Sequence, residues 1–162
     1  MLNYFSWLNI MPPQIAVMII SMVPFAENRL AVPVALGVYH LPIWQALFFS
    51  IIGSIVASTI IIFGLDFLYY RLRGHLGFMD GIIQRIFDRT EQKFMHKYER
   101  WGELALLLFV AAPLPMTGAW TGSIAAFLFG VKPLRALLFI SLGVILSAGT
   151  VAFLSLGIIN FI

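Results

Sequence analysis

The chain contains no cysteine and few charged residues. Of its 162 residues, 61% are hydrophobic and only 10% are charged, whereas a soluble domain carries about 25% charged residues. The absence of cysteine excludes disulfides and thiolate-ligated metal sites. The shortage of charge excludes an ordinary soluble domain, so we expect an integral membrane protein. Residues 1–12 lack the basic segment of a cleaved signal peptide, and Met1 is therefore expected to begin the mature chain.

The charges are gathered in the middle of the chain. Residues 66–103 hold six of the seven acidic residues and seven of the ten basic residues. Outside this block stand four charged residues, Glu27, Arg29, Lys132 and Arg135. The chain therefore consists of an apolar segment, a charged segment and a second apolar segment.

The apolar stretches differ in length. A helix needs about 20 residues to cross a bilayer, and only 42–65 and 134–158 are long enough. Four shorter stretches lie in pairs, each pair separated by a turn rich in proline, glycine or charge: 13–25 with 30–39, and 104–112 with 123–130. We predict that each pair forms a re-entrant hairpin, with its turn buried in protein or lining a wet cavity.

These lengths predict one all-α membrane domain over residues 1–162, built as two inverted repeats. Each repeat is a re-entrant helical hairpin followed by one transmembrane helix, over 13–65 and 104–158, and 66–103 is the cytoplasmic surface segment between them. The positive-inside rule puts the basic loop 71–100 and the turn at Lys132 in the cytoplasm and both termini outside, in a multi-pass protein of the plasma (inner) membrane. An arrangement of six full spans gives the same sidedness.

The charged segment carries an amphipathic pattern. Apolar residues recur every three or four positions over 79–101, which predicts one helical stripe with charges opposite. Four basic residues form an i,i+4 row: Arg85, Arg89, Lys93 and Lys97. Like charges at this spacing repel, so we predict an amphipathic helix on the cytoplasmic surface, bound to anionic membrane lipids. The alternative is a solvated connector; no nucleic-acid partner is expected.

The first hairpin turn reads "VPFAENRLAVP". Pro24 is expected to end the first half-helix, Asn28 to cap the second, and Pro33 to lie in its first turn. The tip then carries Glu27 and Arg29 near the middle of the bilayer. Charges at that depth are costly unless paired or hydrated, which makes both residues candidates for function. The alternative is a structural role, in which the two charges neutralise each other and cap the helix.

The second hairpin turn reads "APLPMTGAWTGS". Two prolines stop the incoming half-helix, and the returning half-helix begins with free amides that attract anions. We expect the two tips to meet and the second to contribute substrate or ion contacts. The candidate residues of this turn are Pro113, Pro115, Thr117, Gly118, Trp120, Thr121 and Ser123. The spacing of Gly118 and Gly122 also fits helix packing, as do Gly53 with Ala57 and Gly143 with Ser147 on the long spans.

Motifs for catalysis are missing. The sequence has no H-E-x-x-H helix, no paired aspartates and no Ser–His arrangement suited to an intramembrane hydrolase, and no P-loop. We therefore expect neither an enzyme nor a bound cofactor or metal.

Both turns resemble a known family. "ENRLAVPVALG" is similar to the E-x-R-x-x-x-P-x-x-x-G turn of the small multidrug export protein family, and "APLPMTGAWTGSIAA" resembles its P-L-P-x-T-G-A-W turn. The resemblance covers roughly residues 13–158. It implies a membrane export protein, distantly similar in architecture to the DedA/VTT membrane proteins, which share paired re-entrant hairpins and are linked to lipid translocation.

Residues and resemblance together predict a small secondary transporter or lipid translocase, with or without coupling to protons or sodium. Glu27 would be the protonatable or cation-binding group, Arg29 would hold the anionic part of a small anion or lipid, and residues 117–123 would line the other side. One copy has only two full spans to shield these tips, so a homodimer is expected. The alternative is a non-transporting membrane scaffold or regulatory subunit.

Overall fold

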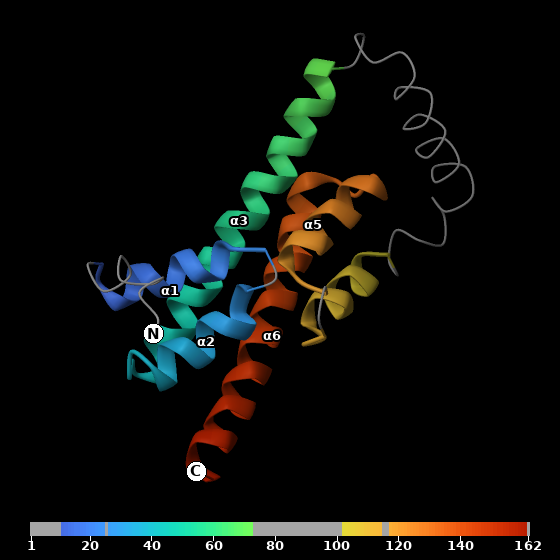
Figure 1. The fold of residues 1–162 in the computed structure, drawn as a ribbon. Helices are drawn as coiled ribbons and strands as arrows, with labels where there is room; N and C mark the ends of the chain where they lie inside the picture. The colour runs from blue at the N-terminus through green and yellow to red at the C-terminus, as the bar shows by residue number, and fades with distance from the viewer. Residues whose placement is uncertain (1–10, 25, 73–101, 115–116, 162) are drawn as a thin grey trace.

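A computed structural model describes residues 11–24, 26–72, 102–114 and 117–161, and every regular element in these ranges is an α-helix. The predicted all-α class is therefore confirmed for this part of the chain. Figure 1 labels five helices and leaves a sixth, Gly102–Ala111, without a label. The labelled helices are α1 (Pro13–Met22), α2 (Glu27–Gly37), α3 (Ile43–Leu72), α5 (Ala119–Leu128) and α6 (Pro133–Phe161).

The two long helices are α3, with 30 residues, and α6, with 29. At 1.5 Å per residue each is about 45 Å long, which exceeds the ~30 Å of a hydrocarbon core. Both contain an apolar stretch of mean hydropathy 2.4 that is long enough to cross a membrane. The two long apolar helices that the sequence predicts are thus present, and α3 continues past the expected end at residue 65 because "LDFLYYRL" contains no proline or glycine.

The two long helices run antiparallel (Figure 1). Ala46, early in α3, packs in one cluster with Val151, late in α6. Ile62, late in α3, packs in another with Ala136, early in α6. The C-terminal end of α3 therefore lies beside the first residues of α6, as expected if the Lys132 turn and the start of the charged segment share one side.

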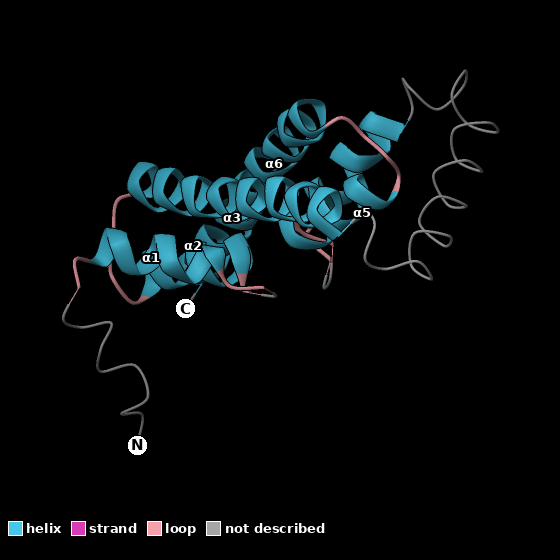
Figure 2. Cartoon of the chain, turned by 90° about the horizontal axis from the view of Figure 1, so that it is seen from above, coloured by secondary structure: helices cyan, strands magenta, loops and turns pink. Residues whose placement is uncertain are grey.

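The short helices lie in two groups along this pair. In Figures 1 and 2, α1 and α2 lie beside the earlier part of α3, and α5 lies toward the other end of that helix. Helices α1 and α5 have 10 residues each, about 15 Å at the helical rise. Helix α2 begins at Glu27 rather than at 30, and α5 at Ala119 rather than at 123. The first turn, 23–26, is therefore as long as predicted but begins three residues earlier, and the second turn, 112–118, is shorter than predicted.

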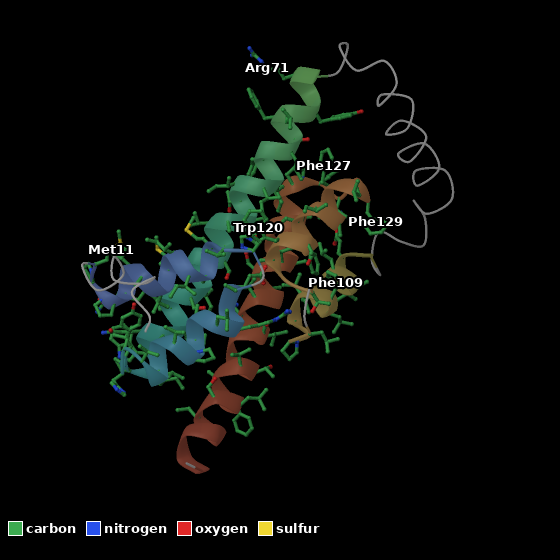
Figure 3. All side chains as sticks on the ribbon, viewed as in Figure 1. Met11, Arg71, Phe109, Trp120, Phe127 and Phe129 are labelled. Atoms are coloured by element: carbon green, nitrogen blue, oxygen red, sulfur yellow. The ribbon has the colours of Figure 1, made fainter. Side chains whose placement is uncertain are left out.

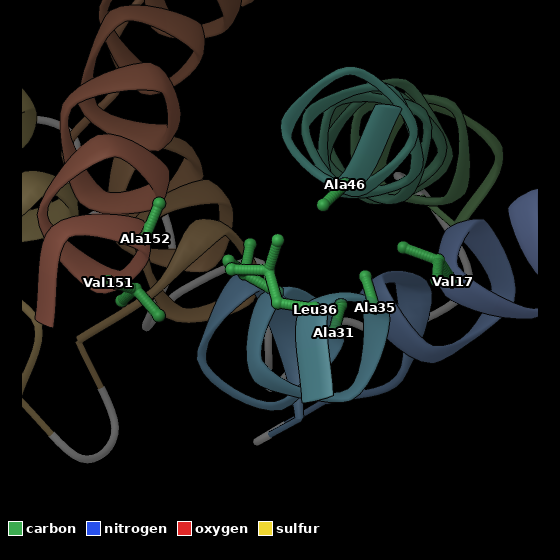
Figure 4. Packing of buried hydrophobic residues seen from close by; sticks show 8 residues of the cluster. Val17, Ala31, Ala35, Leu36, Ala46, Val151 and Ala152 are labelled. Carbon is green, nitrogen blue, oxygen red and sulfur yellow. The ribbon is translucent and has the colours of Figure 1, made fainter. Parts of the chain in front are cut away.

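Both core clusters contain several alanines. In the first, Ala31 and Ala35 of α2 pack among Val17 of α1, Ala46 of α3 and Ala152 of α6 (Figure 4). The second joins α3, Gly102–Ala111, α5 and α6. Its buried members are Ile62, Leu106, Val110, Ala119, Ala126, Ala136, Ile140 and Val144. Alanine at these positions lets the helix backbones approach closely.

Each long helix has a glycine where a short helix crosses it. A Cβ at Gly53 of α3 would overlap the Met18 carbonyl oxygen of α1. A Cβ at Gly143 of α6 would lie 2.9 Å from the carbonyl oxygen of Leu107. The predicted packing role of these glycines is confirmed.

Pro33 does not lie in the first turn of its helix, as the sequence suggested. Since α2 begins at Glu27, Pro33 lies inside it. Proline has no N–H, so Pro33 cannot donate to the carbonyl of Arg29 four residues earlier. Pro24 follows the end of α1 at Met22, as expected.

Several predictions concern residues outside the described ranges. They are Pro115 of the second turn and the amphipathic helix over 79–101, with its basic row Arg85, Arg89, Lys93 and Lys97.

Candidate functional site at the hairpin tips

Glu27 caps a helix that lies far from it in the sequence. Its Oε2 accepts a hydrogen bond of 3.1 Å from the Ala119 N–H, and its Oε1 accepts one of 3.1 Å from the Trp120 N–H. These amides open α5, where no intrahelical acceptor exists for them. The Glu27 side chain is buried, with 8% of the residue exposed. A carboxylate at a helix N-terminus also opposes the positive end of the helix dipole.

Arg29 contacts the other side of the same turn. Its Nη2 donates to the backbone oxygen of Thr117, to Thr117 Oγ1 at 3.0 Å and to the Ala112 oxygen at 3.3 Å. Ala112 directly follows the helix Gly102–Ala111, whose last carbonyls form the negative end of its dipole. The buried Nε of Arg29 has no hydrogen-bond partner among the described residues.

Glu27 and Arg29 do not pair with each other. The ion pair found among the described residues joins Arg135 to Glu103, at 3.4 Å, and none joins Glu27 to Arg29. Residues two apart on a helix do not face each other, and here their side chains bind opposite sides of one turn. The mutual neutralisation considered as an alternative is therefore not the arrangement in the structure. Each charge instead complements the end of a different helix.

The backbone at Glu27 has an unusual conformation. Its φ is 39°, in the left-handed region, which costs a residue with a Cβ roughly 1–2 kcal/mol. Its N–H donates to the Val23 oxygen at 3.2 Å and closes the turn between α1 and α2. A strained residue of this kind persists only where its surroundings hold it, and here the hydrogen bonds to α5 do so.

Gly118 leaves the space in which the Glu27 side chain reaches the start of α5. A Cβ at Gly118 would overlap the Glu27 carboxylate. The backbone of Gly118 is extended, with φ −137° and ψ −169°, so space rather than conformation requires glycine here. The predicted close approach at Gly118 is confirmed. Gly122 lies one turn later, where a Cβ would be 2.6 Å from Val110 Cγ2, and it serves helix packing.

Asn28 connects the tip to both long helices. Its Nδ2 donates to the Val144 oxygen of α6 at 3.2 Å. Its Oδ1 accepts from Ser50 Oγ at 2.7 Å and from Ser54 Oγ at 2.9 Å, both on α3. The predicted N-cap role of Asn28 is wrong, because the cap position is Ala26 and carries no side-chain hydrogen bond. The side chain turns inward because buried serine hydroxyls offer it partners there.

The sequence interpretation missed Ser50 and Ser54. A signal was present, since Ser50, Ser54 and Ser58 recur every four residues on one face of an otherwise apolar span. All three are buried. Hydroxyls that share a face of a membrane helix are candidates for contacts between helices.

The remaining candidates of the second turn divide into two groups. Trp120 reaches the first hairpin, because its Nε1 donates to the Met22 oxygen at the end of α1 at 3.0 Å. Figure 3 labels Trp120 at this point, between α1 and α5. Thr121 and Ser123 instead bond to backbone within their own turn and helix, Ser123 Oγ donating to Ala119 at 2.6 Å. Pro113 is exposed in the turn itself.

The structure thus brings together Glu27, Arg29, Thr117, Gly118 and Trp120, which we name the tip junction. The α5 amides expected to attract an anion hold the chain's own carboxylate. Over the described ranges, no three His, Asp or Glu side chains come together in a way that could hold a metal ion.

Comparison with known proteins identified one family. The family described as "Putative small multi-drug export protein" matches residues 27–150, which include the whole tip junction. The comparisons found no match among the curated proteins or the solved structures. The more distant similarity to DedA/VTT proteins stays a prediction.

Proposed function

Because the chain belongs to the small multi-drug export protein family, we propose that it is a multi-pass transport protein of the cell membrane whose substrate passes the tip junction. Two apolar helices long enough to span a bilayer support a membrane location. The name of the family supports export as the general activity. The tip junction supports its own choice as the site, because it gathers two ionisable side chains between otherwise apolar helices.

The observation that carries this proposal is the bond of Glu27 to α5. An ionised carboxylate accepts two amide hydrogen bonds and opposes the helix dipole, whereas a protonated carboxyl loses the charge that makes both favourable. Protonation of Glu27 would therefore loosen the contact between the hairpins. In this mechanism a proton gradient acts on Glu27 and so drives the separation of the two hairpins. A sodium ion bound at the carboxylate would act in the same way.

Arg29 is the proposed contact for an anionic part of the substrate. Its Nη2 donates to three acceptors, and its buried Nε has no acceptor among the residues that the structure describes. Guanidinium binds carboxylate and phosphate through paired N–H groups. The substrate class that fits is a small anion or a lipid phosphate.

The proposed architecture is the pair of inverted repeats. Two features support it. Each long helix follows a pair of short helices, and the first helix of that pair crosses the long helix at a glycine, which is Gly53 in α3 and Gly143 in α6. Helices about 15 Å long reach half of a bilayer, which supports re-entrant insertion. A homodimer is the proposed means of shielding the tips, and chemical crosslinking in native membranes tests it.

A scaffold remains the second candidate, and a specific observation favours it. Both charges of the tip junction already have partners within the chain. Such bonds could serve only to lock the hairpins together, since buried polar contacts can specify one arrangement without further function.

Flux through reconstituted protein separates these candidates. Wild type, Glu27→Gln and the control Glu103→Gln are placed in liposomes, and drugs, small anions and lipid phosphates are assayed with and without a pH gradient. We expect wild type to move at least one class faster with the gradient, and Glu27→Gln to lose this dependence. Glu103→Gln should keep it, because Glu103 lies in a partly exposed ion pair away from the tips. No flux of any class by wild type would favour the scaffold.

A further inference from the structure

A pocket opens at the far end of the long helices, away from the tip junction. Its volume is about 230 Å³, and it is lined mainly by apolar side chains of α3, α5 and α6. Tyr69 and Phe127 form part of the wall, with ring centroids 6.0 Å apart in an edge-to-face arrangement. Figure 3 labels Phe127 near the upper part of α3.

Two opposite charges line this pocket. Asp66 comes from α3, and Lys132 directly precedes α6. Both residues are exposed, and no ion pair joins them within the described structure. An apolar pocket with one acid and one base complements a ligand that has an apolar part and carries both charges.

We propose that this pocket binds the headgroup of a zwitterionic phospholipid with a primary amine, such as phosphatidylethanolamine. Lys132 binds the phosphate and Asp66 binds the ammonium. The apolar wall contacts the first methylenes of the lipid. The cavity is too small for a whole lipid, so the acyl chains extend into the bilayer along the exposed apolar faces of α3 and α6.

Location supports this ligand. The pocket lies where the C-terminal end of α3 meets the first residues of α6, and a charged residue directly follows α3 and directly precedes α6. The ends of spanning helices lie at the depth of the lipid headgroups. The site does not depend on the tip junction, so it holds whether or not the protein transports.

Native mass spectrometry of the full-length protein in detergent tests the site with three short-chain lipids: phosphatidylethanolamine, phosphatidylcholine and phosphatidylglycerol. We expect the tightest binding for phosphatidylethanolamine, because the trimethylated amine of phosphatidylcholine cannot donate to Asp66 and phosphatidylglycerol has no positive charge. Asp66→Asn should weaken the binding of phosphatidylethanolamine about fivefold, the upper range for an exposed charge pair. It should leave the binding of phosphatidylglycerol unchanged. Lys132→Gln should weaken the binding of both lipids.

Two control variants keep the test decisive. Asp66→Glu retains the carboxylate and should keep the preference for phosphatidylethanolamine. Arg71→Gln removes an exposed charge of α3 that does not line the pocket, and binding should not change. Equal binding of the three lipids by wild type, or unchanged preference in Asp66→Asn, overturns the proposal. Loss of preference in both Asp66 variants also overturns it, because the carboxylate would then not be the determinant.

Discussion

The carboxylate of Glu27 occupies the space that a side chain at Gly118 would need. The two residues come from different hairpins, and their contact lets the Glu27 oxygens reach the first two amides of α5. Gly118→Ala should therefore push the carboxylate away from α5. We expect a loss of about 1–3 kcal/mol in stability, typical of overpacking, measured by thermal unfolding in detergent.

Gly64→Ala is the matched control. Gly64 lies in α3, and a Cβ there would meet nothing within 4 Å. Alanine favours a helix over glycine by roughly 0.5–1 kcal/mol, so this variant should unfold at or above the wild-type temperature. Equal stability of Gly118→Ala and Gly64→Ala would contradict the contact between Gly118 and Glu27.

Glu27 and Arg29 should each contribute to stability through partners of their own. The two side chains bind different partners and do not bind each other. Glu27→Gln and Arg29→Gln should therefore each lower the free energy of unfolding by about 1–3 kcal/mol, the cost of leaving a buried partner unsatisfied. The double variant should be less stable than either single variant, and the deviation from the sum measures their coupling through the turn at 117–120. Thermal unfolding of the four proteins gives the coupling energy. Recovery of stability in the double variant would show instead that the two charges neutralise each other.

Asn28→Ala should loosen the contact between the long helices. It leaves the buried hydroxyl of Ser50 without its acceptor, at a cost of about 1–3 kcal/mol, whereas the Ser54 hydroxyl keeps the Ser21 carbonyl oxygen at 3.3 Å. Adding Ser50→Ala should restore part of the loss, because the hydroxyl left without an acceptor is then removed. Thr150→Ala serves as control, since that hydroxyl is exposed and bonds only within its own helix. Unfolding temperatures in one detergent provide the comparison.

Cysteine labelling tests the proposed topology. The chain has no cysteine of its own, so single cysteines at Gly37 and Lys132, both exposed, report without background. Gly37 should react with an impermeant reagent from outside, and Lys132 only after the cytoplasmic face is opened. Reaction of both from one side of intact cells would rule out a crossing between them.

The sequence was most informative where one local property decides structure. The lengths of the apolar stretches predicted the two long helices, and Pro24 predicted the end of α1. The partners of the tip residues could not be predicted in this way. Glu27 bonds to amides 92 and 93 positions away, and any helix start offers such amides, so composition does not say which one it will cap. Asn28 was misassigned for the same reason, because a local capping rule takes no account of serines on another helix.

Pro33 has a mechanical consequence for α2. The missing donor leaves the turn that carries Glu27 and Arg29 joined to the rest of the helix by one hydrogen bond fewer than in a continuous helix. A helix bends most easily at such a point. Helix α2 can thus flex most easily at Pro33, whereas the hydrogen bonds of Asn28 to α3 and α6 hold its first turn against both long helices.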